Sequence, residues 1–112
     1  MKEKLEIILK AIDEKKGEDI LIYAFSQLNP SVDKVVIASG SNVRQTFAIA
    51  DNVRDRLAEA GMRINHMEGN RDSRWILIDA DEIIVHIFEQ KERNVYHLEK
   101  LYADLPVSRY DV

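Results

Sequence analysis

The sequence predicts an α/β protein: a single small domain over residues 1–112, with helices flanking a mixed sheet of about five strands. Three observations predict it. A segment of helical periodicity, residues 43–60, lies between stretches that are typical of strands. Two apolar runs, at 75–79 and 83–88, are separated by only a few residues, as in a β-hairpin. A chain of 112 residues with 46% apolar and 32% charged side chains also has the size and composition of one folded domain.

The first part of the chain predicts one helix and two strands. A helical stripe that stops at Gly17 is formed by Leu5, Ile8, Leu9 and Ile12. Residues 19–25 are dense in branched and aromatic side chains, which favours a strand. After a turn at 29–31, the branched run at 35–38 is typical of a strand that is covered on both faces.

The middle of the chain predicts a strand, a helix and a second strand. Ser39 to Asn42 end the strand and begin the helix, because Ser and Asn side chains accept hydrogen bonds from the free amides of a first turn. Gly61 follows the last helical residue as a C-terminal cap. Residues 62–67 can form the next strand, and the order predicts a right-handed parallel crossover.

The last third predicts a hairpin and a helix. The strands 75–79 and 83–88 are joined by a tight link at Asp79-Ala80-Asp81. A short amphipathic helix that ends before Pro106 is predicted from Val95, Leu98, Leu101 or Tyr102, and Leu105.

Charge is distributed unevenly. Residues 1–78 carry 12 acidic and 12 basic side chains, whereas residues 79–112 carry 8 acidic and 4 basic ones, so the last third holds the whole net charge of −4. No cluster of Lys and Arg is present, which argues against direct nucleic-acid binding. An acidic end would attract a basic protein partner, although an ordinary solvated acidic face remains the alternative interpretation.

The sequence contains no cysteine, which excludes disulfides, thiolate metal sites and cysteine nucleophiles. No apolar run approaches the ~20 residues that cross a bilayer. We therefore expect a soluble, cytoplasmic protein that does not bind a membrane.

Two motifs suggest nucleotide chemistry. Ser39-Gly40-Ser41 lies at a strand-to-helix junction, where anions bind, but it has neither a dinucleotide fingerprint nor a phosphate loop, and a capped turn is the favoured interpretation. Asp79 and Asp81 could hold a divalent ion. Together the motifs leave a magnesium-dependent nucleotidyltransferase or nucleotide-binding domain as an alternative. The 38 positions between Ser41 and Asp79 argue against it and favour acidic residues that shape a hairpin turn.

No other arrangement indicates catalysis. His66, His86 and His97 are scattered, and His86 lies in an apolar strand, where a hydrogen-bonded structural histidine is the favoured interpretation. We therefore predict no catalytic residue, no cofactor and no metal.

Aromatic and charged residues instead suggest recognition. Trp75 begins a strand, and its indole N–H needs a partner if the whole ring is buried. Arg93, Tyr96, Glu99 and Lys100 recur at helical spacing. Trp, Tyr and Arg dominate binding hot spots, so these residues predict an interface, and an aromatic core over the sheet is the alternative for Trp75.

The sequence resembles the ribosomal silencing factor family, also called the Iojap or RsfS family, over about residues 3–105. The similarity begins with Ser39-Gly40-Ser41-x-x-Arg44-Gln45 and Ala48-Ile49-Ala50-Asp51-Asn52-Val53. It continues through Glu68-Gly69, Trp75-x-Leu77-x-Asp79, Asp81, Val85-His86-x-Phe88, Arg93 and Tyr96-x-Leu98-Glu99-x-Leu101. Ala80 stands where the family commonly has Gly, and Tyr102 where it often has Trp.

The resemblance implies a translation repressor without enzymatic activity, whose fold is distantly similar to nucleotidyltransferases. Family members bind large-subunit ribosomal protein fourteen and obstruct subunit joining when nutrients are short. Relatives in organelles act in large-subunit biogenesis, and some members form homodimers. The partner-binding residues that the resemblance implies here are Trp75, Leu77, Asp79, Asp81, His86, Arg93, Tyr96 and Glu99.

Overall fold

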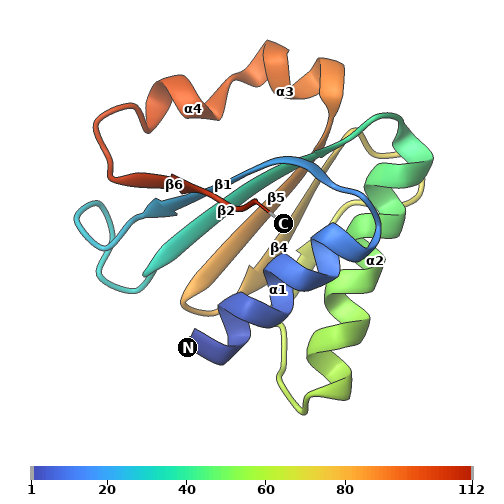
Figure 1. The fold of residues 1–112 in the computed structure, drawn as a ribbon, viewed down its shortest axis with the longest axis horizontal. Helices are drawn as coiled ribbons and strands as arrows, with labels where there is room; N and C mark the ends of the chain where they lie inside the picture. Colours follow the sequence, from blue (N-terminus) through green and yellow to red (C-terminus); the bar gives the residue numbers. More distant parts are fainter. Residues whose placement is uncertain (1, 112) are drawn as a thin grey trace.

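The computed structural model describes residues 2–111 and contains a mixed six-stranded sheet with helices on both faces (Figure 1). The strand order is β3-β4-β5-β2-β1-β6. The elements are α1 (Lys2–Glu14), β1 (Glu18–Ala24), β2 (Lys34–Gly40), α2 (Val43–Glu59), β3 (His66–Glu68), β4 (Trp75–Ala80), β5 (Ile83–Glu89), α3 (Gln90–Tyr96), α4 (Leu98–Leu101) and β6 (Val107–Arg109). The predicted α/β class with a mixed sheet is confirmed.

The centre of the sheet is the parallel pair β2 and β5, and the other neighbouring strands are antiparallel. The predicted hairpin of β4 and β5 is present, with Trp75 opposite Phe88 and Asp79 opposite Ile84. The sheet has one strand more than predicted, because β6 pairs with β1 near the end of the chain. Its three residues are too few to give a periodic signal.

The crossover that leaves β2 through α2 ends in β3, which is not a neighbour of β2 in the sheet. β3 runs in the same direction as β2, but β4 and β5 lie between them. It begins only at His66, whereas the sequence predicted a strand from residue 62. The strand pairs on one side only, along three residues of β4.

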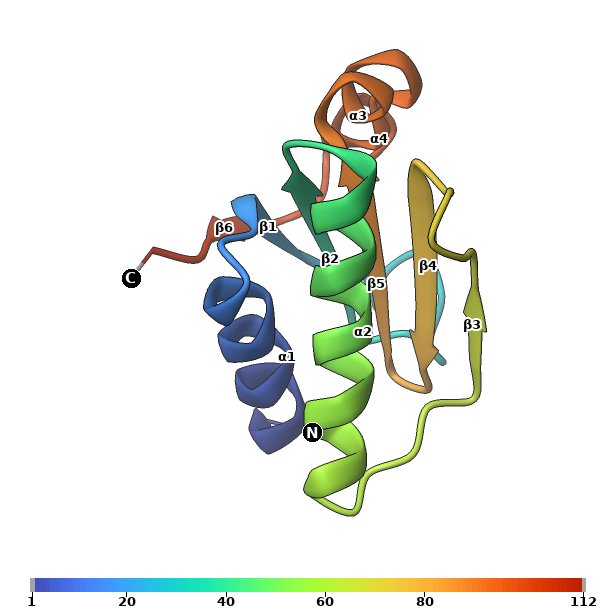
Figure 2. The same ribbon diagram turned by 90° about the vertical axis from the view of Figure 1, so that its right-hand side faces the viewer.

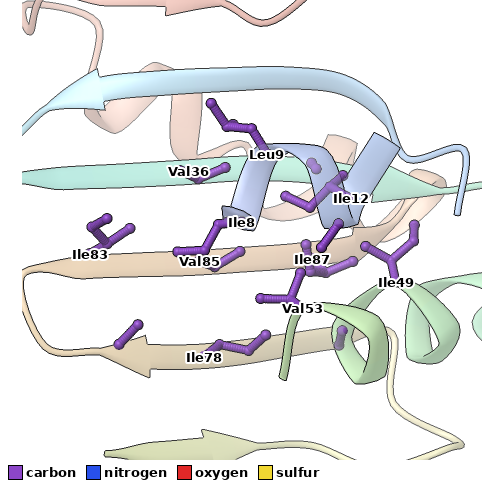
Figure 3. Close-up of a cluster of buried hydrophobic side chains, with 14 of the residues drawn as sticks. Ile8, Leu9, Ile12, Val36, Ile49, Val53, Ile78, Ile83, Val85 and Ile87 are labelled. Atoms are coloured by element: carbon purple, nitrogen blue, oxygen red, sulfur yellow. The ribbon is translucent and has the colours of Figure 1, made fainter. Parts of the chain in front are cut away.

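One face of the sheet is closed by α1 and α2, which lie side by side against it (Figure 2). Ile8 and Ile12 of α1 and Ile49 and Val53 of α2 are fully buried. They face an aliphatic layer that is formed by the strand residues Val36, Ile78, Ile83, Val85 and Ile87 (Figure 3). Each such side chain contributes about 1.5–3 kcal/mol relative to an exposed one, so this layer is the main source of stability.

The other face is covered only in part. Tyr23, Val35, Ile37 and Phe88 are buried there beneath Leu105 and the partly buried Leu98 and Tyr102. Tyr102 packs edge-on against Tyr23, at 5.4 Å between ring centroids, and against Phe25, at 5.2 Å. The cover lies over β1, β2 and the adjacent end of β5, and it does not extend over β3 and most of β4 (Figure 2).

The prediction of one final helix is wrong, because the chain forms two helices that meet at His97. This residue is left-handed, with φ 52° and ψ 56°, and its N–H donates to the Arg93 carbonyl. A left-handed residue ends an α-helix. The break redirects the chain, so that Leu98 and Tyr102 pack on the buried cluster of this face. We call this cluster, formed by Tyr23, Val35, Ile37, Phe88 and Leu105, the second core.

The predicted cap at Asn42 and the predicted stops at Gly17 and Gly61 are present, but the two glycines are needed for different reasons. Asn42 caps α2 by accepting from the Gln45 N–H, and Gly61 follows the helix with φ 73°. After α1, the left-handed residue is Lys16, with φ 62°. Gly17 is needed for space, because a Cβ there would lie 2.3 Å from Cγ2 of Ile12. Among the helices of residues 2–111, none has the length and apolar character to cross a membrane.

Two signature residues tie α2 to α1. Asn52 is buried and donates from Nδ2 to the Ala11 carbonyl, at 2.8 Å, and to Glu14 Oε1, at 3.0 Å. Gln45 donates from Nε2 to the carbonyls of Lys15 and Lys16. These residues of the family signature therefore have a structural role.

We predict that Asn52→Ala lowers the free energy of unfolding by about 1–3 kcal/mol, because it leaves a buried carbonyl without a donor. Urea denaturation measures the change. Asp55→Ala, on the exposed side of the same helix, is the matched control and should stay within about 0.5 kcal/mol of the unsubstituted protein. Equal losses in both variants would contradict the assigned role.

Candidate functional site

The candidate site lies on the face of the sheet opposite α1 and α2. It is the half of that face that α3 and α4 leave uncovered. Side chains alternate between faces along a strand, and cross-strand partners share a face. The register therefore places Trp75, Leu77 and Asp79 of β4 beside Ile84 and His86 of β5. We call these five residues the open face. Glu68 and His66 of β3 extend it at the edge of the sheet.

Trp75 is partly buried at one end of the open face. Its ring stacks on Phe88, at 4.8 Å between centroids, and Tyr96 of α3 packs against it at 4.7 Å. The indole N–H donates to Nδ1 of His86 at 3.0 Å. Beside the ring lies a hollow of about 400 Å³, which is also lined by Glu68, Gly69 and Leu77. Trp75 thus packs against the second core while part of its surface stays accessible.

His86 is buried, with 7% of its surface exposed. Burial disfavours the charged imidazolium and lowers the pKa of His86 to about 4. The ring is therefore neutral at physiological pH. The predicted hydrogen-bonded histidine is confirmed, and its partner is the Trp75 indole.

The acidic residues of the hairpin shape its turn, as predicted. Asp79 Oδ1 accepts from the Asp81 N–H at 3.0 Å, and Asn65 donates to the Asp81 carboxylate. Asp81 is left-handed, with φ 66°, a conformation that Asp tolerates. Ala80 belongs to β4 and has no positive φ, so the alanine in place of the family's glycine causes no strain.

The two nucleotide-like motifs lie at opposite ends of the sheet. Gly40 is level with Glu89 of β5, whereas Asp79 is level with Ile84, five residues or about 17 Å along the strand. The amides near Ser41 are also occupied, since Ser41 N–H donates to Gln45 Oε1 at 2.7 Å. Within residues 2–111, no group of three or more His, Asp or Glu side chains could hold a metal ion. The arrangement that a nucleotidyltransferase requires is not assembled.

Arg93 and Glu99 were predicted to contact a partner, and the structure places them in contact with each other. Arg93 is 8% exposed and donates from Nη1 to Ser39 Oγ, at 2.7 Å, and from Nε to Glu99 Oε1, at 2.5 Å. The pair joins α3, α4 and β2. Tyr96, by contrast, is 53% exposed at the edge of the open face.

Sequence reasoning missed Ile84 and Glu68. Ile84 lies two residues before His86, and this alternation along a strand could have placed both on one face. Glu68 could be placed only from the pairing of β3 with β4, which no local pattern predicts.

These observations define a class: a small α/β domain whose mixed sheet is closed by two helices on one face and carries an aromatic and acidic surface on the other. The family model described as ribosomal silencing factor during starvation matches residues 1–112. The chain belongs to this family of ribosomal silencing factors.

Individual relatives agree with this. The chain is 36% identical to ribosomal silencing factor RsfS of Bacillus subtilis over 107 residues, 96% of this chain and 91% of that protein. A crystal structure of a Chromobacterium violaceum protein matches with a TM-score of 0.88 and 29% identity, over all of this chain and 93% of that one. A Bacillus halodurans crystal structure matches with a TM-score of 0.86 and 32% identity, over 98% of this chain and all of that one. The distant likeness to nucleotidyltransferases stays a prediction.

The lowered pKa of His86 predicts a pH-dependent stability. The unfolded chain, with a pKa near 6.5, binds a proton more readily than the folded one, with a pKa of about 4. The contribution of His86 is therefore complete above pH 6.5 and falls by about 3 kcal/mol as the pH drops to 4. Denaturation of the unsubstituted protein and of His86→Gln at several pH values measures it. The two free energies of unfolding should converge toward acid pH, and parallel curves would contradict the prediction.

Proposed function

We propose that the open face binds large-subunit ribosomal protein fourteen, and that the bound protein blocks joining of the two ribosomal subunits. The observation that carries this proposal is the uncovered half of an otherwise packed sheet, with an apolar and aromatic centre and an acidic edge. Membership in the ribosomal silencing factor family supports a ribosomal partner.

The centre of the face has the composition of a binding hot spot. Trp75, with Tyr96 against it, offers a large aromatic surface beside a hollow, and Leu77 and Ile84 add partly buried aliphatic surface. Rigid aromatic residues that are ordered before binding lose little entropy on association. Hydrogen bonding and stacking hold Trp75 in place before the partner arrives.

The edge of the face has the charge to attract a basic protein. On this side, strands β3, β4 and β5 present two carboxylates, Glu68 and Asp79, and no Lys or Arg. Asp81 lies at the turn that follows. Complementary charge speeds encounter and fixes orientation more than it adds affinity. Arg93 and Glu99 would act indirectly, by holding the segment that carries Tyr96.

Inhibition would be steric and would need no enzymatic activity. A body of 35 × 34 × 27 Å that is bound on the joining surface excludes the other subunit by its volume. The expected result is repressed translation in the cytoplasm when nutrients are limited, and a part in large-subunit biogenesis would use the same contact. A homodimer through the open face is the competing arrangement.

Co-sedimentation tests the proposal directly. We expect the protein to sediment with purified large ribosomal subunits of Bacillus subtilis and not with joined ribosomes, because joining buries the contact surface. Light scattering of separated subunits should show slower joining when the protein is present. Equal binding to joined ribosomes, or no binding to large subunits, would contradict the proposal. Self-association that removes binding would identify the homodimer as the occupant.

The acidic edge predicts a salt-dependent affinity. Asp79→Asn keeps the acceptor for the Asp81 N–H while it removes the charge, and Glu68→Gln removes the second one. Together they should weaken binding at low salt by about 1 kcal/mol, roughly fivefold, and flatten the salt dependence. Asp55→Asn combined with Glu6→Gln, on the exposed sides of α2 and α1, is the control of equal charge change. An unchanged affinity at low salt would refute the steering role.

A further inference from the structure

We infer that His86 determines specificity on the open face, because it presents a fixed Nε2–H donor that selects a protein partner with an acceptor oxygen at that point. The inference rests on the proposed function and deepens it. It concerns the chemistry that the partner must offer, and not the identity of the partner.

The hydrogen bond to Trp75 fixes the tautomer of His86. An indole nitrogen can only donate, so the atom that it meets must accept. That atom is Nδ1, at 3.0 Å from Trp75 Nε1. In a neutral imidazole only one nitrogen carries the proton, and an accepting Nδ1 requires that the proton is on Nε2. Burial lowers the pKa of His86 to about 4, so the ring is neutral and carries a single ring proton.

The Nε2–H group has no partner within the described part of the chain. Among residues 2–111, His86 makes one side-chain hydrogen bond, and it uses Nδ1. In the same residues, no side-chain nitrogen or oxygen that is shut off from solvent lacks a hydrogen-bond partner. Nε2 therefore keeps contact with water in the free protein and loses it when another surface covers the face.

The neighbours of His86 make this donor important. Leu77 lies opposite it on β4, and Ile37 lies opposite it on β2. Neither side chain can accept a hydrogen bond. A partner that covers the face without an acceptor would strip the N–H of water and leave it unpaired, which is costly. A partner with a carbonyl or carboxylate oxygen there would satisfy it.

His86 and Asp79 make the two ends of the open face different, because one offers a hydrogen-bond donor and the other an acceptor. The donor lies toward the Trp75 end and the carboxylate toward the hairpin turn, on diagonal positions, with Leu77 opposite His86 and Ile84 opposite Asp79. A lysine or arginine head can only donate, so His86 disfavours it at the centre, whereas Asp79 accepts it at the edge. The pattern therefore sets which way a basic protein lies across the face.

Two amide substitutions separate the functions of the two ring nitrogens. An Asn amide reaches about as far as Nδ1, so His86→Asn can still accept from the indole, but its NH2 group ends short of the Nε2 position. A Gln amide reaches about as far as Nε2, so His86→Gln restores a donor there. Each variant is measured for binding to purified large ribosomal subunits of Bacillus subtilis, and its melting temperature and indole N–H resonance report folding and the state of Trp75.

We expect His86→Asn to weaken binding about tenfold, equivalent to about 1.4 kcal/mol, and His86→Gln to remain within about threefold of the unsubstituted protein. In the free protein, nitrogen-15 spectra should show Nε2 protonated and Nδ1 unprotonated, a measurement that needs no variant.

Three results would overturn the inference: a proton on Nδ1, binding by His86→Asn at the level of the unsubstituted protein, or equal weakening by both variants when both are folded. Failure of the unsubstituted protein to bind large subunits would instead overturn the proposed function, and the inference with it. The two failures are distinguished by that one control.

Discussion

The parallel pairing of β2 with β5 is the constraint on which the rest of the molecule depends. It sets Val36 opposite Val85 and Ile37 opposite His86, and thereby sorts the side chains of both strands between the two faces. The aliphatic side chains of the two strands pack against α1 and α2. The side chains of the opposite face, which include Phe88 and His86, point away from these helices. A slip of one residue would put histidine and aromatic side chains beneath the helices and valines on the opposite face. The register between β2 and β5 therefore determines both which side chains form the core and which form the candidate site.

The second constraint is how little of the chain remains to cover the other face. After β5, two short helices and a three-residue strand must serve a six-stranded sheet. Arg93 anchors them through Ser39 and Glu99, and a buried cation of this kind is stable only with such partners. The anchor holds the cover over β1 and β2, where Tyr102 and Leu105 complete the second core. What is left uncovered is the open face.

The open face combines two properties that recognition needs. It is ordered without a partner, because Trp75 stacks on Phe88 and donates to His86. No helix or loop of the described residues covers its aromatic and aliphatic side chains, and the Nε2–H of His86 has no protein acceptor there. Preorganisation reduces the entropy that binding must offset, and incompleteness leaves surface to be buried. A protein that acts by occupying a surface, as we propose here, requires both properties.

Elements with local signals could be predicted from the sequence. The periodicity of α2 with its Asn42 cap, the hairpin of β4 and β5 and the acidic turn lie within short windows of the chain, and the family resemblance is a series of short motifs in a fixed order. The fold was needed to show that α3 ends at Tyr96, before the left-handed His97, that β6 joins the sheet, that Arg93 turns inward, and that Trp75 meets His86. Two of these depend on contacts between residues far apart in the sequence: Arg93 meets Ser39, 54 positions away, and β6 pairs with β1. Backbone periodicity repeats within a few residues, whereas the partner of a side chain is chosen by packing across the sheet, which is why the first could be predicted and the second could not.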